Sequence, residues 1–534
     1  MKSFAELYRT LDETTKTTVK VGAMRSYFQK CSSSDGAWGV FFLSGRRLNR
    51  LLPTKLLREW AAEQAQIPDW MFEECYGAVG DLAETMALLL HAPGEQAEFS
   101  LTDWVENRIR PLASMSSEEQ RFALHEAWNQ LSVHERFVFN KLVTGSFRVG
   151  VSQGLVIRAL AEASQLPQAT IAHRLMGKWE PTARFFIQLM SDDDGETNHS
   201  QPYPFALAHP FQEEPETLGD PDQWLLEWKW DGIRGQIIRR NGESFLWSRG
   251  EELILERFPE LNPAISTLPD GTVLDGEVLG WKDGKPLPFA ELQRRIGRKT
   301  VGKKLLADVP ARFIAFDLLE AGGVDLRELP LAHRRERLVS LISADDPESS
   351  ILLSSLVEGD SWEALRLQRS SSRNFHVEGI MMKRKDSPYP LGRVTGLWWK
   401  WKVNPFTCDA VLMYAQRGHG RRASLYTDYT FGVWDNGQLI PFAKAYSGLT
   451  DAEIREVDRF IRKNTVEKFG PVRSVKPELV FELAFENIQL STRHKSGIAV
   501  RFPRMSRWRQ DKKADQADTL DGIRSLMAGE PTVT

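Results

Sequence analysis

The spacing of apolar residues changes near residue 200 and divides the chain into two kinds of structure. Over residues 4–190, apolar side chains recur every three or four positions between proline and glycine stops, which is the spacing of one helix face. The clearest stretches are residues 55–64, 69–90, 101–110 and 117–131. We therefore predict an all-α N-terminal domain.

Beyond residue 203 the pattern becomes one of short, alternating strands. Residues 225–250 are predicted to form consecutive antiparallel strands, because Asn241-Gly242 supplies the two positive φ angles of a tight turn. Asp283-Gly284 predicts a second such turn. Further strands are expected at 272–281, 313–319, 377–383 and 397–402, with a helix at 253–258. Strands with one helix, at 451–464, then favour a small closed barrel of the oligonucleotide-binding type.

The chain is too long for a single hydrophobic core, since it has 534 residues. Residues 191–202, SDDDGETNHSQP, are acidic and polar, which is typical of an interdomain linker. We expect three domains: a helical domain over 1–195, a domain of strands and helices over 196–404, and a barrel domain over 405–534.

The composition indicates the cellular compartment of the protein more clearly than its function. The net charge of −3 gives no support for a nucleic-acid partner, but residues 293–304, 417–422 and 501–513 are locally basic. No apolar run is long enough to span a membrane, and the polar N-terminus lacks the apolar core of a signal peptide. Three scattered cysteines fit a reducing compartment and exclude a C-x-x-C zinc cluster. A cytoplasmic protein without a membrane partner is expected.

Lys229 lies in the most informative strand, in the sequence EWKWD. Alternation places it opposite two tryptophans and on one face with Glu227 and Asp231. A solvent-exposed strand with mixed charges would show the same pattern. The later strands favour a functional site instead, because they bring further charged residues to the same side of the strands as Lys229. These residues are Glu277, Glu378, Lys400 and Lys402.

These residue types together suit phosphorus chemistry. A lysine amine is a nucleophile only when it is deprotonated, and neighbouring cations such as Lys400 and Lys402 lower the pKa of such an amine. Two glutamates, Glu277 and Glu378, suit a Mg²⁺ ion that bridges a polyphosphate. The sequence therefore predicts phosphoryl or nucleotidyl transfer. It contains no GxxxxGK[ST] loop, which excludes a P-loop NTPase.

One segment of the helical region also suggests a phosphate contact. In FNKLVTGSFRVGVSQ a glycine-rich loop enters a helix at Ser152, the expected N-cap. Free amides at that helix start, beside Arg148, would bind a phosphate. A plain turn between two helices would explain the same glycines.

An ordered series of motifs resembles the set found in ATP-dependent DNA ligases. The series is KWDGIR (229–234), SRGEE (248–252), LDGEV (274–278), FIAFDLL (313–319), VEGIMMK (377–383), WWKWK (398–402) and RFPRMSRWRQDK (501–512). The N-terminal segments FFLSGRRLNRLL, ECYGAVGDLAETMALLL and FNKLVTGSFRVGVSQ are similar to the helical DNA-binding domain of the larger members. The resemblance implies an all-α DNA-binding domain, an α+β, ATP-grasp-like adenylyltransferase core with antiparallel sheets, and a C-terminal OB-fold β-barrel.

The resemblance also implies roles for individual residues. Lys229 would be the adenylated nucleophile, Glu227 would recognise the adenine, and Phe316 would stack on it. Arg234 and Arg249 would hold ribose and phosphate, although SRGEE lacks the Asn or Asp that is frequent after the arginine in relatives. Glu277 and Glu378 match the carboxylates that bind the metal ion. Lys400 and Lys402 match the lysines that contact the α-phosphate. The residues that match those orienting pyrophosphate are Arg501, Arg507 and Lys512.

Two aromatic residues match positions that press on the minor groove beside a nick, namely Phe289 and Phe502. Core packing would explain both equally well. With Arg148, they complete the residues expected to contact DNA.

The implied activity is ATP- and Mg²⁺-dependent sealing of 5′-phosphate/3′-hydroxyl nicks in duplex DNA, with Mn²⁺ as an alternative ion. It proceeds through lysyl-AMP and adenylated DNA in three nucleotidyl transfers. A monomer that encircles DNA near the nucleoid is expected, with a repair nuclease or helicase as a further partner. RNA ligases and mRNA-capping guanylyltransferases share the K-x-D-G core, but the helical domain and the RFPR ending argue against both. The full set of charged motif residues argues against a non-catalytic nick-binding protein.

Overall fold

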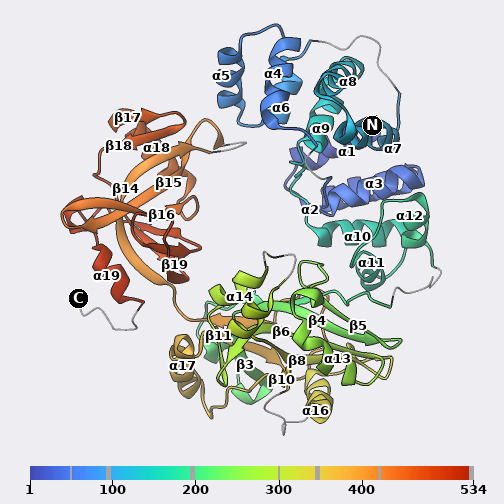
Figure 1. The fold of residues 1–534 in the computed structure, drawn as a ribbon, viewed down its shortest axis with the longest axis vertical. Coiled ribbons are helices and arrows are strands. Elements are labelled where there is room, and N and C mark those ends of the chain that lie inside the picture. The colour runs from blue at the N-terminus through green and yellow to red at the C-terminus, as the bar shows by residue number, and fades with distance from the viewer. Residues whose placement is uncertain are drawn as a thin grey trace. The chain divides into compact units, whose positions relative to one another are not determined.

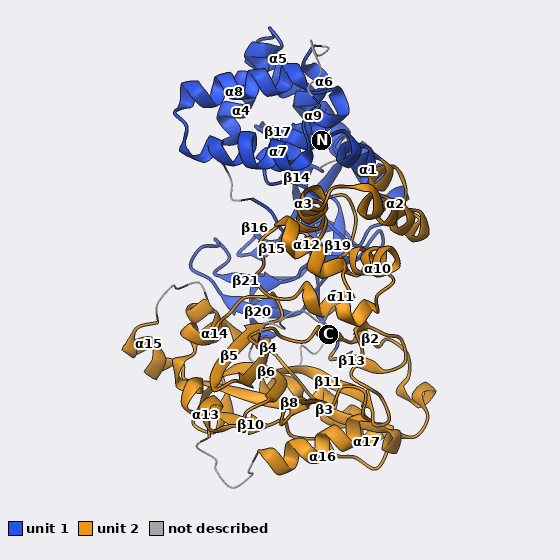
Figure 2. Cartoon of the chain, turned by 90° about the vertical axis from the view of Figure 1, so that its right-hand side faces the viewer, with its two compact units in different colours: residues 1–9, 46–148, 404–534 blue, residues 10–45, 149–403 orange. Residues whose placement is uncertain are grey.

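The computed structural model describes residues 1–48, 51–91, 98–192, 199–296, 298, 301–342, 349–418 and 422–527. The chain forms two compact units, one from residues 1–9, 46–148 and 404–534 and the other from residues 10–45 and 149–403 (Figure 2). Part of the expected linker, residues 193–198, lies outside the described residues. No helix among the described residues is long and apolar enough to cross a membrane.

The first unit begins with helices, as the spacing predicts. After α1 (Lys2–Glu13) these are α4 (Thr54–Gln64), α5 (Asp69–Val79), α6 (Leu82–Leu89), α7 (Leu101–Asp103), α8 (Ser117–Gln130) and α9 (Val133–Val143). The helical stretch expected over 69–90 forms two helices: Gly80 ends α5 at φ 76°, and Asp81 caps α6 by accepting from the amide of Glu84. After α7 the helix widens into a π-helix at Trp104–Ile109.

The same unit ends in curled antiparallel strands (Figure 1). The main sheet runs β16 (Gln438–Ala445), β15 (Tyr426–Asp435), β14 (Phe406–Arg417), β18 (Val472–Val475), β17 (Thr465–Phe469), and β19 (Val480–Phe485) joins β14 to β22 (Arg504–Trp508). A hairpin of β20 (Asn487–Leu490) and β21 (Ile498–Arg501) and a short α19 (Leu520–Ser525) complete it. Helix α18 (Asp451–Asn464) confirms the predicted helix, and its Val457 and Ile461 enter the core beside Phe431 and Leu483.

Among the described residues of the second unit, five helices precede the sheets: α2 (Thr17–Lys30), α3 (Ser33–Leu43), α10 (Gln153–Ser164), α11 (Gln168–Arg174) and α12 (Ala183–Met190). Helix α2 packs on α10, and Lys20 of α2 donates to the carbonyls of Val149 at 3.3 Å and Gly150 at 2.9 Å. This buried lysine fixes the loop before α10. Ser152 occupies the predicted N-cap position, but its side chain forms no capping hydrogen bond, so that part of the prediction is wrong.

Two larger sheets and short helices form the rest of the second unit (Figure 1). The seven-stranded sheet contains β10 (Ile351–Leu353), β8 (Ala311–Ala321), β6 (Thr272–Lys282), β4 (Ile233–Arg240) and β5 (Glu243–Ser248) in this order, with β7 (Lys285–Pro286) and β9 (Val324–Asp325) beside it. The four-stranded sheet contains β2 (His209–Pro210), β13 (Trp398–Lys402), β11 (Val377–Arg384) and β3 (Trp224–Trp230). The helices are α13 (Asn262–Thr267), α14 (Phe289–Ile296), α15 (Lys303–Asp308), α16 (Leu331–Leu341) and α17 (Trp362–Ser370), and β1 (Ala206–Leu207) pairs with β12 (Gly392–Arg393).

The local turns are confirmed, but the pairing of the first strand is not the predicted one. Asn241 and Gly242 take φ angles of 52° and 74°, and Asp283 and Gly284 take 51° and 76°. Strand β4 forms a hairpin with β5, whereas β3 crosses to the other sheet and pairs with β11. The helix expected over 253–258 is also wrong. A bridge holds Leu253 against Trp247, and two short 3-10 turns, Leu255–Arg257 and Pro259–Leu261, precede α13.

The four-stranded sheet separates its side chains as the alternation predicts. Its apolar face, with Leu226, Ile380 and Trp401, packs against Trp362 and Leu365 of α17. The opposite face carries the lysines. On the seven-stranded sheet, one face packs against the short helices, and the other joins a cluster that includes Trp398 of β13. The lysine-bearing face of one sheet therefore lies against a face of the other.

Candidate active site

Lys229 and Glu378 form the centre of the site between the two sheets. Lys229 Nζ lies 2.5 Å from Glu378 Oε2, and Lys402 Nζ lies 3.2 Å from the same oxygen. A β-bulge interrupts β11 between Val377 and Ile380, where Gly379 takes φ 137°. Such a bulge re-aims the neighbouring side chain. Strands β3, β11 and β13 thus bring one carboxylate to two ammonium groups.

Lys400 adds a third cation beside this pair. Burial, followed by the charges of Lys229 and Lys402, lowers the pKa of Lys400. Among the described residues its side chain forms no ion pair. Burial alone would raise the pKa of Glu378, but the two lysines that contact it lower that pKa below its ordinary value. The cluster has an excess of positive charge and suits a polyphosphate.

Glu277 of β6 lies near this cluster, and its side chain forms no hydrogen bond or ion pair with any described residue. Burial raises the pKa of Glu277 to about 7, even though Lys229 and Arg234 act in the opposite direction. No group of three or more His, Cys, Asp or Glu side chains within the described ranges is placed to hold a metal ion. A Mg²⁺ ion that takes one or two carboxylates and keeps water and phosphate ligands needs no such group. The two glutamates therefore fit Mg²⁺.

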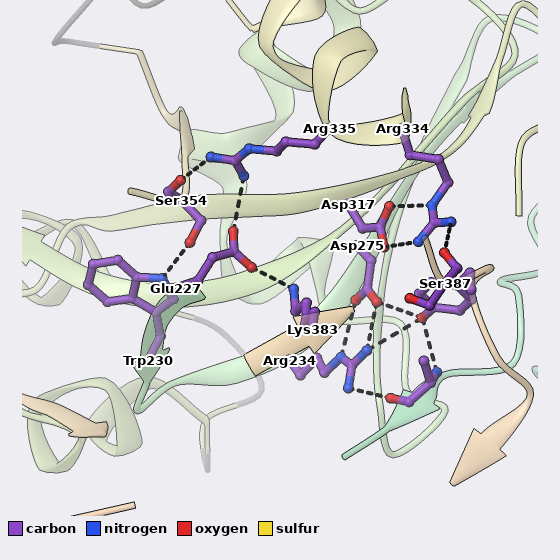
Figure 3. A network of polar contacts seen from close by, with 12 residues as sticks. Glu227, Trp230, Arg234, Asp275, Asp317, Arg334, Arg335, Ser354, Lys383 and Ser387 are labelled. Atoms are coloured by element: carbon purple, nitrogen blue, oxygen red, sulfur yellow. Dashed lines mark hydrogen bonds and ion pairs between the residues drawn. The ribbon is translucent and has the colours of Figure 1, made fainter. Parts of the chain in front are cut away.

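Arg234 is already bonded to protein groups (Figure 3). It donates to both carboxylate oxygens of Asp275, at 3.2 and 2.7 Å, and to the carbonyl of Ala206 at 2.6 Å. Asp275 also accepts from the Tyr389 hydroxyl at 2.6 Å. These bonds tie β4 to β6. Arg249, by contrast, is exposed just after β5, and its backbone amide donates to the Arg234 carbonyl.

Glu227 lies on the same strand face as Lys229 and is 1% exposed. It accepts from Arg335 Nη1 at 3.0 Å and from Lys383 Nζ at 2.6 Å (Figure 3). Lys383 Nζ also lies 4.1 Å from the centre of the buried Phe316 ring. The sequence analysis missed both cations. Lys383 ends the VEGIMMK motif and could have been found there, whereas Arg335 lies on α16, outside every motif.

The remaining predicted residues divide between the two units. Phe289 of the second unit packs partly buried against the core of the seven-stranded sheet. In the first unit, Phe502 is 64% exposed at φ 54° between β21 and β22, with the Arg501 guanidinium 5.2 Å from its ring. Arg507 pairs with Glu482 at 3.3 Å and Lys512 with Asp409 at 2.6 Å, while Arg148 is exposed.

Three family profiles match the chain. The ATP dependent DNA ligase domain matches residues 205–402, the DNA ligase N terminus matches residues 1–161, and the ATP dependent DNA ligase C terminal region matches residues 422–512. The matches fall within the helical region, the two-sheet region and the curled sheet.

Individual proteins and a solved structure are similar to this chain over nearly its whole length. A probable DNA ligase of Koribacter versatilis is 31% identical, over 98% of this chain and 95% of that protein. DNA ligase 1 of Korarchaeum cryptofilum is 27% identical, over 98% of both chains. The structure titled Pmar-Lig_PreS3 shares the fold, with a TM-score of 0.63 and 16% identity over 95% of this chain and 99% of that one. The chain therefore belongs to the family of ATP-dependent DNA ligases.

Proposed function

We propose that this DNA ligase joins 5′-phosphate and 3′-hydroxyl ends of nicked duplex DNA with Lys229 as the nucleophile. The contact between Lys229 Nζ and Glu378 Oε2, at 2.5 Å, carries the proposal. Glu378 would accept the proton that the amine loses. Lys229 Nζ then attacks the α-phosphorus of ATP, an N–P bond forms, and pyrophosphate leaves.

Two further transfers complete the reaction. An oxygen of the DNA 5′-phosphate attacks the phosphorus of lysyl-AMP, and the N–P bond breaks. The 3′-hydroxyl then attacks the activated 5′-phosphorus, a phosphodiester forms, and AMP leaves. Lys400 and Lys402 would contact the α-phosphate, where charge develops, and fixed cations lower the energy of such a transition state.

Mg²⁺ would be held by Glu277 and Glu378 together with water and phosphate oxygens. When bound, it neutralises charge on the polyphosphate, and Mn²⁺ would substitute for it. The desolvated Glu277 supports this assignment, because a nearby dication stabilises the ionised form of a carboxylate that burial disfavours.

The nucleotide base would lie beside Glu227 and Phe316, with the Glu227 carboxylate accepting from the adenine amino group. Arg249 is exposed and free to contact the ribose or phosphates. For Arg234 we propose an indirect role, since its bonds to Asp275 and Ala206 hold the sheet that carries Glu277.

For DNA contact we propose Arg148 and Phe502, since both side chains are exposed. A bulky residue at positive φ is strained, and such strain is commonly retained at functional positions. Phe289 is assigned to core packing instead. Residues that would orient pyrophosphate are Arg501, Arg507 and Lys512.

The proposed domains are a DNA-binding helical domain over 1–195, an ATP-grasp-like adenylyltransferase domain over 196–404 and an OB-fold over 405–534. They would act in a monomer that encircles DNA.

A pulse–chase experiment tests the ligase reaction. The protein is labelled with α-labelled ATP and Mg²⁺, freed of nucleotide, and then mixed with nicked or fully continuous duplex DNA. We expect label to leave the protein only with nicked DNA and to appear as free AMP in step with sealing. Label that stays on the protein in the presence of nicks would contradict the proposal.

A further inference from the structure

Glu227 belongs to a buried cluster of one carboxylate and two cations. Arg335 binds its Oε1 and Lys383 binds its Oε2, so each oxygen has one cationic partner (Figure 3). The three side chains are 1%, 8% and 2% exposed. The two oxygens are therefore fixed in position, and each retains capacity for one more donor.

Arg335 also connects this cluster to the strand that carries the nucleophile. Its Nη2 donates to the backbone carbonyl of Ser354, and the Ser354 hydroxyl accepts from Trp230 Nε1 at 3.1 Å. Trp230 directly follows Lys229 in β3. The Arg335 guanidinium thus connects the Glu227 carboxylate, which is expected to recognise the base, with the segment at Ser354 that contacts the neighbour of Lys229.

We propose that Arg335 is a positioning residue that sets the preference for a 6-amino purine triphosphate, a role that rests on the proposed function of Glu227. A carboxylate only accepts hydrogen bonds, and the 6-amino group of adenine donates them. The 6-oxo group of hypoxanthine or guanine accepts instead, so two acceptors would face each other. By holding Oε1, Arg335 keeps the carboxylate oriented for the amino group.

Loss of Arg335 removes this constraint. The Glu227 carboxylate is then free to turn toward Lys383, because its Oε1 has lost its cationic partner. Its oxygens are no longer held toward the 6-amino group, so the hydrogen bond that distinguishes a 6-amino from a 6-oxo base weakens. Discrimination between the two bases should fall more than the chemical step does.

The neighbouring arginine provides a matched control. Arg334 lies on the same helix and binds Asp317 at 2.8 and 2.9 Å, and both side chains are fully buried. Replacing either arginine by methionine breaks a buried ion pair, which destabilises the fold. Only the Arg335 pair involves Glu227.

The test compares self-labelling of the full-length protein by α-labelled ATP and ITP, with Mg²⁺. Arg335 borders a cavity of about 570 Å³ that is also lined by Val339, Ser340 and Leu356, so methionine is preferred to alanine because it keeps the side-chain length. For Arg335→Met we expect KM for ATP to rise roughly tenfold or more, as for loss of a charge-assisted hydrogen bond. KM for ITP and both maximal rates should change less, so the ATP/ITP ratio of kcat/KM falls about tenfold.

The controls separate positioning from stability. Arg334→Met should leave the ATP/ITP ratio unchanged, and Arg335→Lys, which keeps the charge without the planar fork, should lower it partly. An unchanged ratio in Arg335→Met overturns the inference, as does an equal fall in Arg334→Met. If Arg335→Met does not fold, the ATP/ITP ratio of kcat/KM for Arg335→Lys tests the inference instead. A wild-type protein that ATP does not label would overturn the proposed function and this inference with it, whereas a labelled wild type with an unaltered variant ratio overturns only the role of Arg335.

Discussion

Glu277 makes stability depend on pH in a direction that can be worked out from the structure. Burial raises its pKa from 4.5 to about 7. Between these values the folded chain retains a proton that the unfolded chain has released, so stability falls as pH rises through this range. This pKa difference, about 2.5, lowers the free energy of unfolding by roughly 3 kcal/mol at pH 8. Glu277→Gln removes the ionisable group, and with it this loss of stability, without changing the size of the side chain.

Urea unfolding followed by tryptophan fluorescence measures the effect. We expect Glu277→Gln and wild type to be about equally stable at pH 4.5, and the variant to be more stable by up to roughly 3 kcal/mol at pH 8. Millimolar Mg²⁺ should shrink the difference at pH 8, because the ion favours the ionised carboxylate. Glu243→Gln, at an exposed position of β5, should track wild type at both pH values. A difference between Glu277→Gln and wild type that is the same at pH 4.5 and pH 8 would refute the reasoning.

Three further predictions concern Glu378, the nucleotide cofactor and Arg148. Glu378→Gln removes the proton acceptor beside Lys229, so the initial rate of labelling by ATP should fall about a hundredfold; a wild-type rate would remove Glu378 from the reaction. ATP should support labelling and NAD should not, as autoradiography after parallel incubations would show, and efficient labelling by NAD would overturn this specificity. Arg148→Ala should lower the slope of log affinity for nicked DNA against log salt by less than about one unit, because helix-start amides remain as donors; a larger loss would mean that the helix start contributes nothing.

Local features of the fold could be predicted from the sequence where a local interaction decides them. The Asn241-Gly242 turn and helix α18 are of this kind, since two positive φ angles and a three-to-four residue spacing are visible within a few positions. The break between α5 and α6 had a signal as well. Gly80 followed by Asp81 is a helix end and a helix start, but the apolar spacing continues on both sides and conceals it.

The arrangement of the candidate site depends on contacts between distant segments. Strand β3 pairs with β11 rather than with β4, and no local pattern distinguishes these partners. The bulge at Gly379 is likewise decided by the tertiary structure, because a Cβ there would lie 2.3 Å from the carbonyl oxygen of Trp401. Arg335 belongs to an ordinary amphipathic helix, and only the packing of α16 shows that its guanidinium reaches Glu227. Composition gives no sign of such a contact.

The covalent label on Lys229 tests the central claim most directly. Wild type, Lys229→Ala and a control, Lys385→Ala, which changes an exposed lysine just beyond β11, are incubated with α-labelled ATP and Mg²⁺ and then given a pre-adenylated nick. We expect wild type and Lys385→Ala to carry the label. Lys229→Ala should carry none and yet seal part of the pre-adenylated nick, because the last transfer does not use the amine as nucleophile. Normal labelling of Lys229→Ala would contradict the account.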